Sequence, residues 1–183
     1  MTTVAARHVG FVRNVMIGRE GLHRQVLLDL FSDAGGQAPR SYISTGNISF
    51  SAPESDLPLL IASVEEGIAA VIGRHEEVFV RRISALERIV ASDPFAGSPY
   101  PDTVERTVSF LPSDIDLSVV SLPVESTSGR VSVFGATKTE LFSAGRSVGG
   151  RTQGAGGLVE RMLGCRITSR AWSTVLRIVD RPS

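Results

Sequence analysis

Short apolar segments alternate with amphipathic segments through the first half of the chain, and this alternation constrains the fold more than any other feature. The apolar segments predict strands, and apolar side chains at intervals of three and four residues predict helices. The predicted strands span residues 8–13, 41–51 and 78–80, and the predicted helices span residues 22–31, 57–71 and 84–93. Gly46-Asn47 marks a bulge or tight turn inside the second predicted strand.

A stretch dense in proline and glycine, residues 96–102, separates this half from a second half that is richer in strands. We therefore predict two domains, residues 1–98 and residues 99–183. The predicted strands of the second domain span residues 107–111, 119–122, 131–134 and 140–143, with an edge strand at Ile167. Its predicted helices span residues 158–163 and a terminal segment that Thr168 caps and that carries Trp172 on its apolar face.

Composition excludes several classes of protein. Of the 183 residues 42% are apolar and 21% are charged, which is not the composition of a disordered chain. No apolar run is long enough to span a membrane. The single cysteine, Cys165, excludes an internal disulfide framework, and the three histidines have no metal-ligand spacing. The first residues lack the apolar core of a signal peptide. We expect a soluble, cytoplasmic protein with no metal and no cofactor.

The formal net charge of zero conceals an uneven distribution along the sequence. Residues 1–126 hold ten basic and sixteen acidic side chains, whereas residues 127–183 hold nine basic and three acidic ones. This asymmetry directs the search for an anionic ligand to the C-terminal part, provided that the fold does not interleave the two parts. Arginine outnumbers lysine by 18 to 1, which fits either phosphate recognition or a GC-rich genome.

The glycine-dense loop Gly145–Gly157 is the nearest approach to a known phosphate motif. Residues 145–152 have the spacing G-x-x-x-x-G-basic-T, but an arginine replaces the lysine of a P-loop and more glycines follow where a helix should begin. A true P-loop is therefore disfavoured. Two interpretations stay open: a surface loop without a ligand, or a loop in which Arg146, Arg151 and backbone N–H groups hold an anion.

Two further arginines stand at informative positions. Arg13 ends a predicted strand, and ligands of α/β sheets gather at that edge. Arg170 is predicted to lie in the first turn of the last helix, where the helix dipole disfavours a cation. It is therefore either a surface residue without a specific role or a residue placed there for function. Trp172 is best explained by core packing, and Asn47 by a left-handed turn conformation beside glycine.

Five segments together resemble the bacterial domain-of-unknown-function 1697 family. Its motifs LLRGINVGG, YIQSGNVVFSS, NPF, VxFL and TxRNWNTV are similar to residues 11–18, 42–51, 93–95, 108–111 and 168–175. The resemblance implies two α/β-plait (ferredoxin-like) halves of the α+β class, with mixed sheets and helices packed on one face of each. The family positions Arg13, Gly46, Asn47, Arg170 and Thr174 are retained, whereas three family asparagines are replaced by Met16, Ala171 and Ser173.

Neither the residues nor the resemblance specifies a reaction, and the sequence leaves open whether the protein is an enzyme. We predict a binding module for a small phosphate- or carboxylate-bearing ligand such as a nucleotide. The alternatives are an enzyme acting on a small molecule and a protein-interaction domain, and nucleic acid is the weaker ligand because stacking aromatic residues are few. A monomer or homodimer is expected. The predicted ligand-binding residues are Arg13, Thr45, Asn47, Arg146, Arg151, Arg170 and Trp172.

Overall fold

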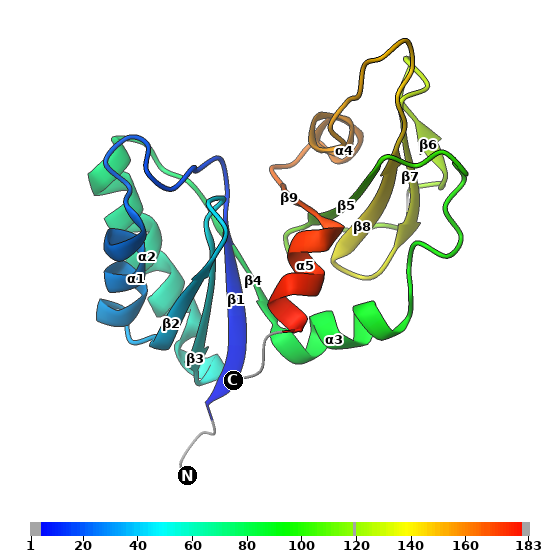
Figure 1. The fold of residues 1–183 in the computed structure, drawn as a ribbon. Coiled ribbons are helices and arrows are strands. Elements are labelled where there is room, and N and C mark those ends of the chain that lie inside the picture. Colours follow the sequence, from blue (N-terminus) through cyan, green and yellow to red (C-terminus); the bar gives the residue numbers. More distant parts are fainter. Residues whose placement is uncertain (1–4, 119, 181–183) are drawn as a thin grey trace. The chain divides into compact units, whose positions relative to one another are not determined.

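The computed structural model describes residues 5–118 and 120–180, which divide into two compact units (Figure 1). The first unit comprises the described residues up to Arg88 together with those from Arg177 onward, and the second unit comprises Ile89–Leu176. Helices α3 (Ile83–Ala91) and α5 (Trp172–Val179) each contribute residues to both units. The fold is α+β, with a separate sheet in each unit. Independent folding of the predicted domains 1–98 and 99–183 stays a prediction.

The first unit is a four-stranded antiparallel sheet with two helices. In chain order its elements are β1 (Ala6–Val12), α1 (Arg24–Asp33), β2 (Gln37–Tyr42), β3 (Asn47–Ala52), a 3₁₀ turn (Glu54–Asp56), α2 (Leu57–Ile72) and β4 (Val78–Arg82). The strands lie in the order β2-β3-β1-β4, and each neighbouring pair is antiparallel. Both helices lie against one face of this sheet (Figure 1), because this packing buries their apolar side chains.

Close helix–sheet packing in the first unit depends on a glycine in β1. A Cβ atom on Gly10 would lie 3.0 Å from the ring of Phe31 in α1, so a larger residue would require that ring to shift away from the strand. The Phe31 ring is also 5.1 Å from the ring of Phe50 in β3, and both side chains are buried. Leu60, Val64 and Ile68 of α2 complete the same core.

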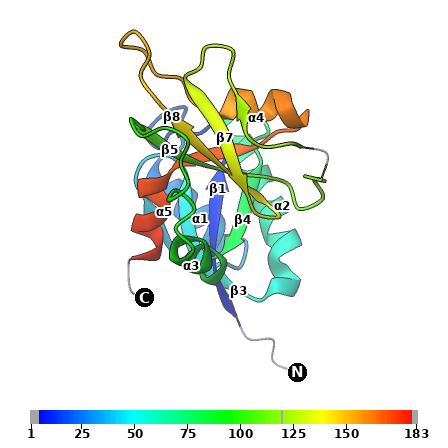
Figure 2. The same ribbon diagram turned by 90° about the vertical axis from the view of Figure 1, so that its right-hand side faces the viewer.

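The second unit holds a five-stranded antiparallel sheet. Its strands are β5 (Glu105–Phe110), β6 (Val124–Glu125), β7 (Val131–Ala136), β8 (Glu140–Gly145) and β9 (Thr168–Ala171), in the spatial order β6-β7-β8-β5-β9. Helix α4 (Gly156–Leu163) lies against one side of the sheet (Figure 2), where Val159 packs with Leu141 and Val133. Gly164 ends α4 in the left-handed conformation that such helix ends favour.

The two units share a strand layout. The order β7-β8-β5-β9 repeats the order β2-β3-β1-β4. In each unit a helix connects the second strand of this order to the fourth, since α2 connects β3 to β4 and α4 connects β8 to β9. The central strands also share the pattern Arg-x-Val-x-Phe, which begins at Arg7 in β1 and at Arg106 in β5. The second unit differs in that the described residues between β5 and β7, 111–118 and 120–130, form no helix.

Several sequence-based expectations need correction. The predicted strand 41–51 is a hairpin of β2 and β3, and β2 was missed because its polar start contains Pro39 and has exposed side chains. The predicted strand 119–122 is not formed at residues 120–122, and residue 119 lies outside the described residues. The expected mixed sheets are wrong, since the described strand pairs are antiparallel.

The start of the last helix also differs from the prediction. Residues 168–171 form β9, which pairs with β5, and α5 begins only at Trp172. Thr168 therefore does not cap that helix. Within the described residues, none of the helices has the length and apolar character that crossing a membrane requires.

Candidate functional site

Thr45 and Asn47, two of the predicted ligand-binding residues, build the turn between β2 and β3. The Asn47 side chain is fully buried, and its Nδ2 donates hydrogen bonds to the carbonyl oxygen of Tyr42 and to Oγ1 of Thr45, each at 3.0 Å. The left-handed conformation expected of Asn47 is found at Gly46 instead, which has a φ of +64°, whereas Asn47 is the first residue of β3. These contacts explain the retained Gly-Asn pair by the geometry of the turn.

Arg13 follows β1 directly, as predicted, and lies in a chain of ion pairs. Its Nη1 is 3.4 Å from Oε2 of Glu76, whose other carboxylate oxygen is 2.9 Å from Nε of Arg74. Arg74 in turn donates to Glu20 and to the backbone oxygen of Asn14. The network ties the loop after β1 to the segment before β4. An anion at Arg13 would compete with the buried carboxylate of Glu76, which weakens the case for a ligand there.

Arg146 in the second unit contacts two other groups of the protein, and its role in ligand binding stays a prediction. Its guanidinium lies 4.3 Å from the centre of the Tyr100 ring, and its Nε donates to the carbonyl oxygen of Gly129 at 2.8 Å. The Tyr100 hydroxyl donates to Glu125 at 3.1 Å. Burial and this hydrogen bond raise the pKa of Tyr100 above its usual range.

The segment around Arg151 is a two-residue turn. Val148 and Arg151 exchange backbone hydrogen bonds of 3.0 and 3.3 Å across Gly149 and Gly150, whose φ angles are +60° and +72°. Positive φ at both central residues is the signature of a type I′ turn, which explains this glycine pair. The Arg151 N–H donates within the turn, so it is not part of a phosphate cradle.

Arg170 lies in β9 and not in the first turn of a helix, which corrects the prediction. It is buried, and its Nη1 donates to Oγ1 of Thr168 at 2.7 Å and to the carbonyl oxygen of Ser169 at 2.9 Å. Burial disfavours the charged form and lowers the pKa of Arg170 to about 10. Trp172 packs against Phe95 with 5.1 Å between ring centroids, as core packing predicts.

The seven predicted residues are split between the units, so their convergence on one site stays a prediction. Arg13, Thr45 and Asn47 belong to the first unit, and Arg146, Arg151, Arg170 and Trp172 belong to the second. Trp172 lines a hollow of about 660 Å³ in the second unit. The same hollow is lined by Glu105 and Arg106 and by Ala171 and Ser173, two positions at which the chain departs from the family motif.

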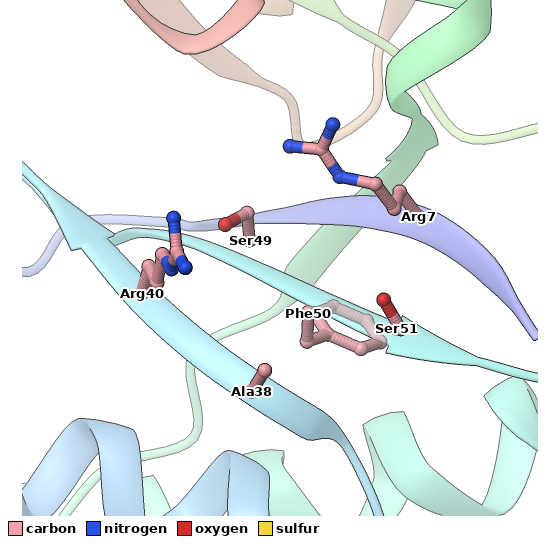
Figure 3. Close-up of a pocket in the computed structure, with 6 residues that line it drawn as sticks. All are labelled: Arg7, Ala38, Arg40, Ser49, Phe50 and Ser51. Atoms are coloured by element: carbon pink, nitrogen blue, oxygen red, sulfur yellow. The ribbon is translucent and has the colours of Figure 1, made fainter. Parts of the chain in front are cut away.

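A different cluster in the first unit was not predicted from the sequence. Two arginines, Arg7 in β1 and Arg40 in β2, flank the hydroxyl groups of Ser49 and Ser51 in β3 around a hollow of about 120 Å³ (Figure 3). Arg7 pairs with Ser51 across the sheet, and Arg40 pairs with Ser49. Residues paired in this way point to the same face, so all four side chains share one face.

The chemistry of this hollow, which we call the Arg7–Arg40 hollow, is that of an anion site. The other residues described in its lining are Ala38 and Phe50, so none of the described lining residues carries a carboxylate. Ser49 is 5% exposed and its Oγ donates to the Tyr42 hydroxyl at 3.4 Å, which fixes it on the sheet, whereas Arg40 is exposed. Phosphate and carboxylate groups accept hydrogen bonds from guanidinium groups and hydroxyls.

The signal for this cluster was present but weak in the sequence. Ser49 and Ser51 alternate with buried Ile48, Phe50 and Ala52, which indicates that the serines face away from the helices. Arg7 lies 44 residues before Ser51, however, and only the strand order brings the two together. Among the described residues, no group of three or more His, Cys, Asp and Glu side chains is placed to hold a metal ion.

A solved structure described as conserved bacterial protein SP0830 from Streptococcus pneumoniae is similar, with a TM-score of 0.67 at 17% identity. The similarity covers 97% of this chain and 100% of that one, and at this identity it shows the fold alone. No curated protein matches the chain. The family model "Protein of unknown function (DUF1697)" matches residues 5–142, which stops short of the segment 168–175. The chain therefore belongs to the DUF1697 family.

Proposed function

We propose that the protein is a binding module for a small anionic ligand and that the first unit carries the site. The observation that supports this most strongly is the Arg7–Arg40 hollow, where two guanidinium groups and two hydroxyls surround a space with no carboxylate in its described lining. Small-molecule sites usually occupy about 300–1,000 Å³, so a hollow of about 120 Å³ fits a charged group rather than a whole nucleotide.

The distribution of charge in the fold supports a site in the first unit over one in the basic C-terminal part. Residues 89–176 hold eight basic and eight acidic side chains, because the acidic segment 93–125 folds into the same unit as the basic segment that follows. The excess of positive charge after residue 126 is thus balanced within the second unit. A local cluster, and not a charged half of the chain, becomes the basis of the proposal.

The strand order supports the finer description of the fold that the resemblance implied. We propose that both units are α/β plaits, since each has the order second-third-first-fourth among four antiparallel strands. In the second unit the described residues of the corresponding connection form no helix, and β6 extends the sheet. In the first unit the Arg7–Arg40 hollow lies on the face that α1 and α2 do not cover.

The proposal is tested by titrating the full-length protein with inorganic phosphate and with acetate at low ionic strength, followed by NMR chemical shifts. We expect shifts of backbone amides in β1, β2 and β3. Arg40→Ala should weaken binding by about tenfold, the effect of losing one hydrogen bond to a charged group. Arg40 is exposed on an edge strand, so the variant should fold.

Arg24→Ala is the matched control, since Arg24 is an exposed arginine that begins α1 on the opposite face of the same sheet. It removes the same charge from the same unit and should leave binding unchanged. Equal weakening in both variants would show a general charge effect, and the absence of binding by either anion would refute the proposed function.

A further inference from the structure

We infer that the Arg7–Arg40 hollow is built for the dianionic group of a phosphate monoester. This inference rests on the proposed function and makes its ligand specific. It states which shape and charge of ligand group would fit the positions of the four polar side chains.

The donors of the hollow come from three strands. Arg7 stands on β1, Ser51 on β3 and Arg40 on β2, so the ligand group is approached from both sides of β3 (Figure 3). The O–H of Ser49 donates to Tyr42, so Ser49 lines the hollow without adding a donor. A carboxylate has two oxygens in one plane and is served by a single guanidinium fork. A phosphate monoester has three terminal oxygens that point in different directions, and donors on three strands suit that geometry better.

The charge of the hollow also favours a dianion. Two guanidinium groups bring two positive charges to the hollow, and its described lining includes no carboxylate. Arg7 need not give up any contact that it makes within the protein, because a guanidinium has five N–H donors. A phosphate monoester carries close to two negative charges at neutral pH, whereas a single carboxylate carries one.

The second unit provides an internal comparison, because its strands follow the same layout. Arg106 takes the place of Arg7, but its cross-strand partner is Ala144 where Arg7 has Ser51. Phe142 stands where the first unit has Ser49, and it pairs with Gly135 where Ser49 pairs with Arg40.

An aromatic side chain also covers this part of the second unit. The ring of Phe95 lies 5.8 Å from Phe142 and 5.9 Å from the guanidinium carbon of Arg106. One strand layout is thus filled by apolar side chains in one unit and by hydroxyls and a second arginine in the other. The fold does not demand the polar set, and this difference between the units supports ligand binding as its explanation.

Calorimetric titration of the full-length protein with phenyl phosphate, phenyl sulfate and phthalate tests the inference. Phenyl sulfate has the same tetrahedral shape but one charge, and phthalate has two charges on planar carboxylates. At about pH 7.5 we expect phenyl phosphate to bind about tenfold more tightly than either. Its advantage over phenyl sulfate should shrink as the pH falls through about 6, where the phosphate becomes a monoanion.

Two variants connect this preference to the hollow. Arg40→Ala removes one of the two positive charges, so it should lose most of the preference for phenyl phosphate over phenyl sulfate. Arg106→Ala removes the corresponding arginine of the second unit and should keep the preference. Phthalate or phenyl sulfate binding as tightly as phenyl phosphate would overturn the inference while leaving an anion site in place. The absence of binding by all three anions would refute the proposed function as well.

Discussion

At the scale of single residues, His8 shows how burial makes stability depend on pH. Its side chain lies in β1, is 1% exposed, and places Nε2 3.3 Å from the carbonyl oxygen of Ala52. Burial disfavours the charged imidazole and lowers the pKa of His8, against smaller opposing effects from the Ala52 carbonyl and Glu54, while Arg82 lowers it further. The folded state therefore favours the neutral ring.

The unfolded chain takes up a proton at the ordinary histidine pKa of about 6.5, before the folded state does. The stabilising contribution of neutral His8 is complete above that pH, and it is lost as the pH falls from there toward the folded pKa. We predict that the free energy of unfolding, measured with urea, decreases between about pH 7.5 and pH 5.5.

His8→Gln should remove most of this dependence, because its side chain does not titrate. His75→Gln is the control, since His75 is an exposed histidine of the same unit, with 58% of its side chain accessible. A wild-type protein that is equally stable at both pH values, or a His8→Gln variant with the wild-type slope, would contradict the prediction.

At the scale of elements, the loop after β1 is fitted to the turn between β2 and β3. Val12 and Ile17 donate backbone hydrogen bonds to Gly46 and Ser44, each at 2.8 Å. A Cβ atom on Gly46 would lie 2.5 Å from Cγ2 of Val15 and 3.0 Å from Cβ of Val12. The segments 11–18 and 42–51, which resemble the family motifs, are thus in close contact at Gly46, where a side chain would not fit.

Gly46→Ala should therefore destabilise the protein by about 2–4 kcal/mol, as the sum of a left-handed alanine and a steric overlap. Gly73→Ala is the matched control, because Gly73 has a φ of +74° with no atom within 4 Å of the added carbon. It should cost only about 1 kcal/mol. Urea denaturation of the two variants measures the difference, and equal losses would show that Gly46 serves only its backbone conformation.

The elements also show what the sequence could and could not predict. Helices α1, α2 and α4 were predicted from their apolar spacing, because that signal is local. Strand β2 was missed because an edge strand with Pro39 has few buried side chains to reveal it. Arg170 was assigned to a helix, since nothing near it in sequence reveals the pairing of β9 with β5.

The same limit applies to the site. Each predicted ligand-binding residue was chosen for its own motif, and several of them, such as Asn47 and Arg146, contact neighbouring protein groups that explain their positions. The Arg7–Arg40 hollow arises instead from three strands that are distant in sequence. Cross-strand pairs of this kind become visible only when the strand order is known.

At the scale of the whole molecule, each unit has its own apolar core, and one tryptophan reports on only one of them. The chain's single tryptophan, Trp172, belongs to the second unit and contacts Phe95 of that unit. The core of the first unit includes Phe31, whose side chain is fully buried between α1 and the sheet. Tryptophan fluorescence therefore follows the second unit, whereas far-ultraviolet circular dichroism follows both.

Replacing a buried phenylalanine by alanine costs about 3–5 kcal/mol of stability. We predict that Phe31→Ala therefore destabilises the first unit and separates the two signals. The dichroism transition in urea should shift to lower concentration or split, while the fluorescence midpoint stays near the wild-type value. Leu141→Ala in the core of the second unit is the matched variant and should move the fluorescence midpoint. If Phe31→Ala shifts both signals together, the units unfold as one cooperative body despite their separate cores.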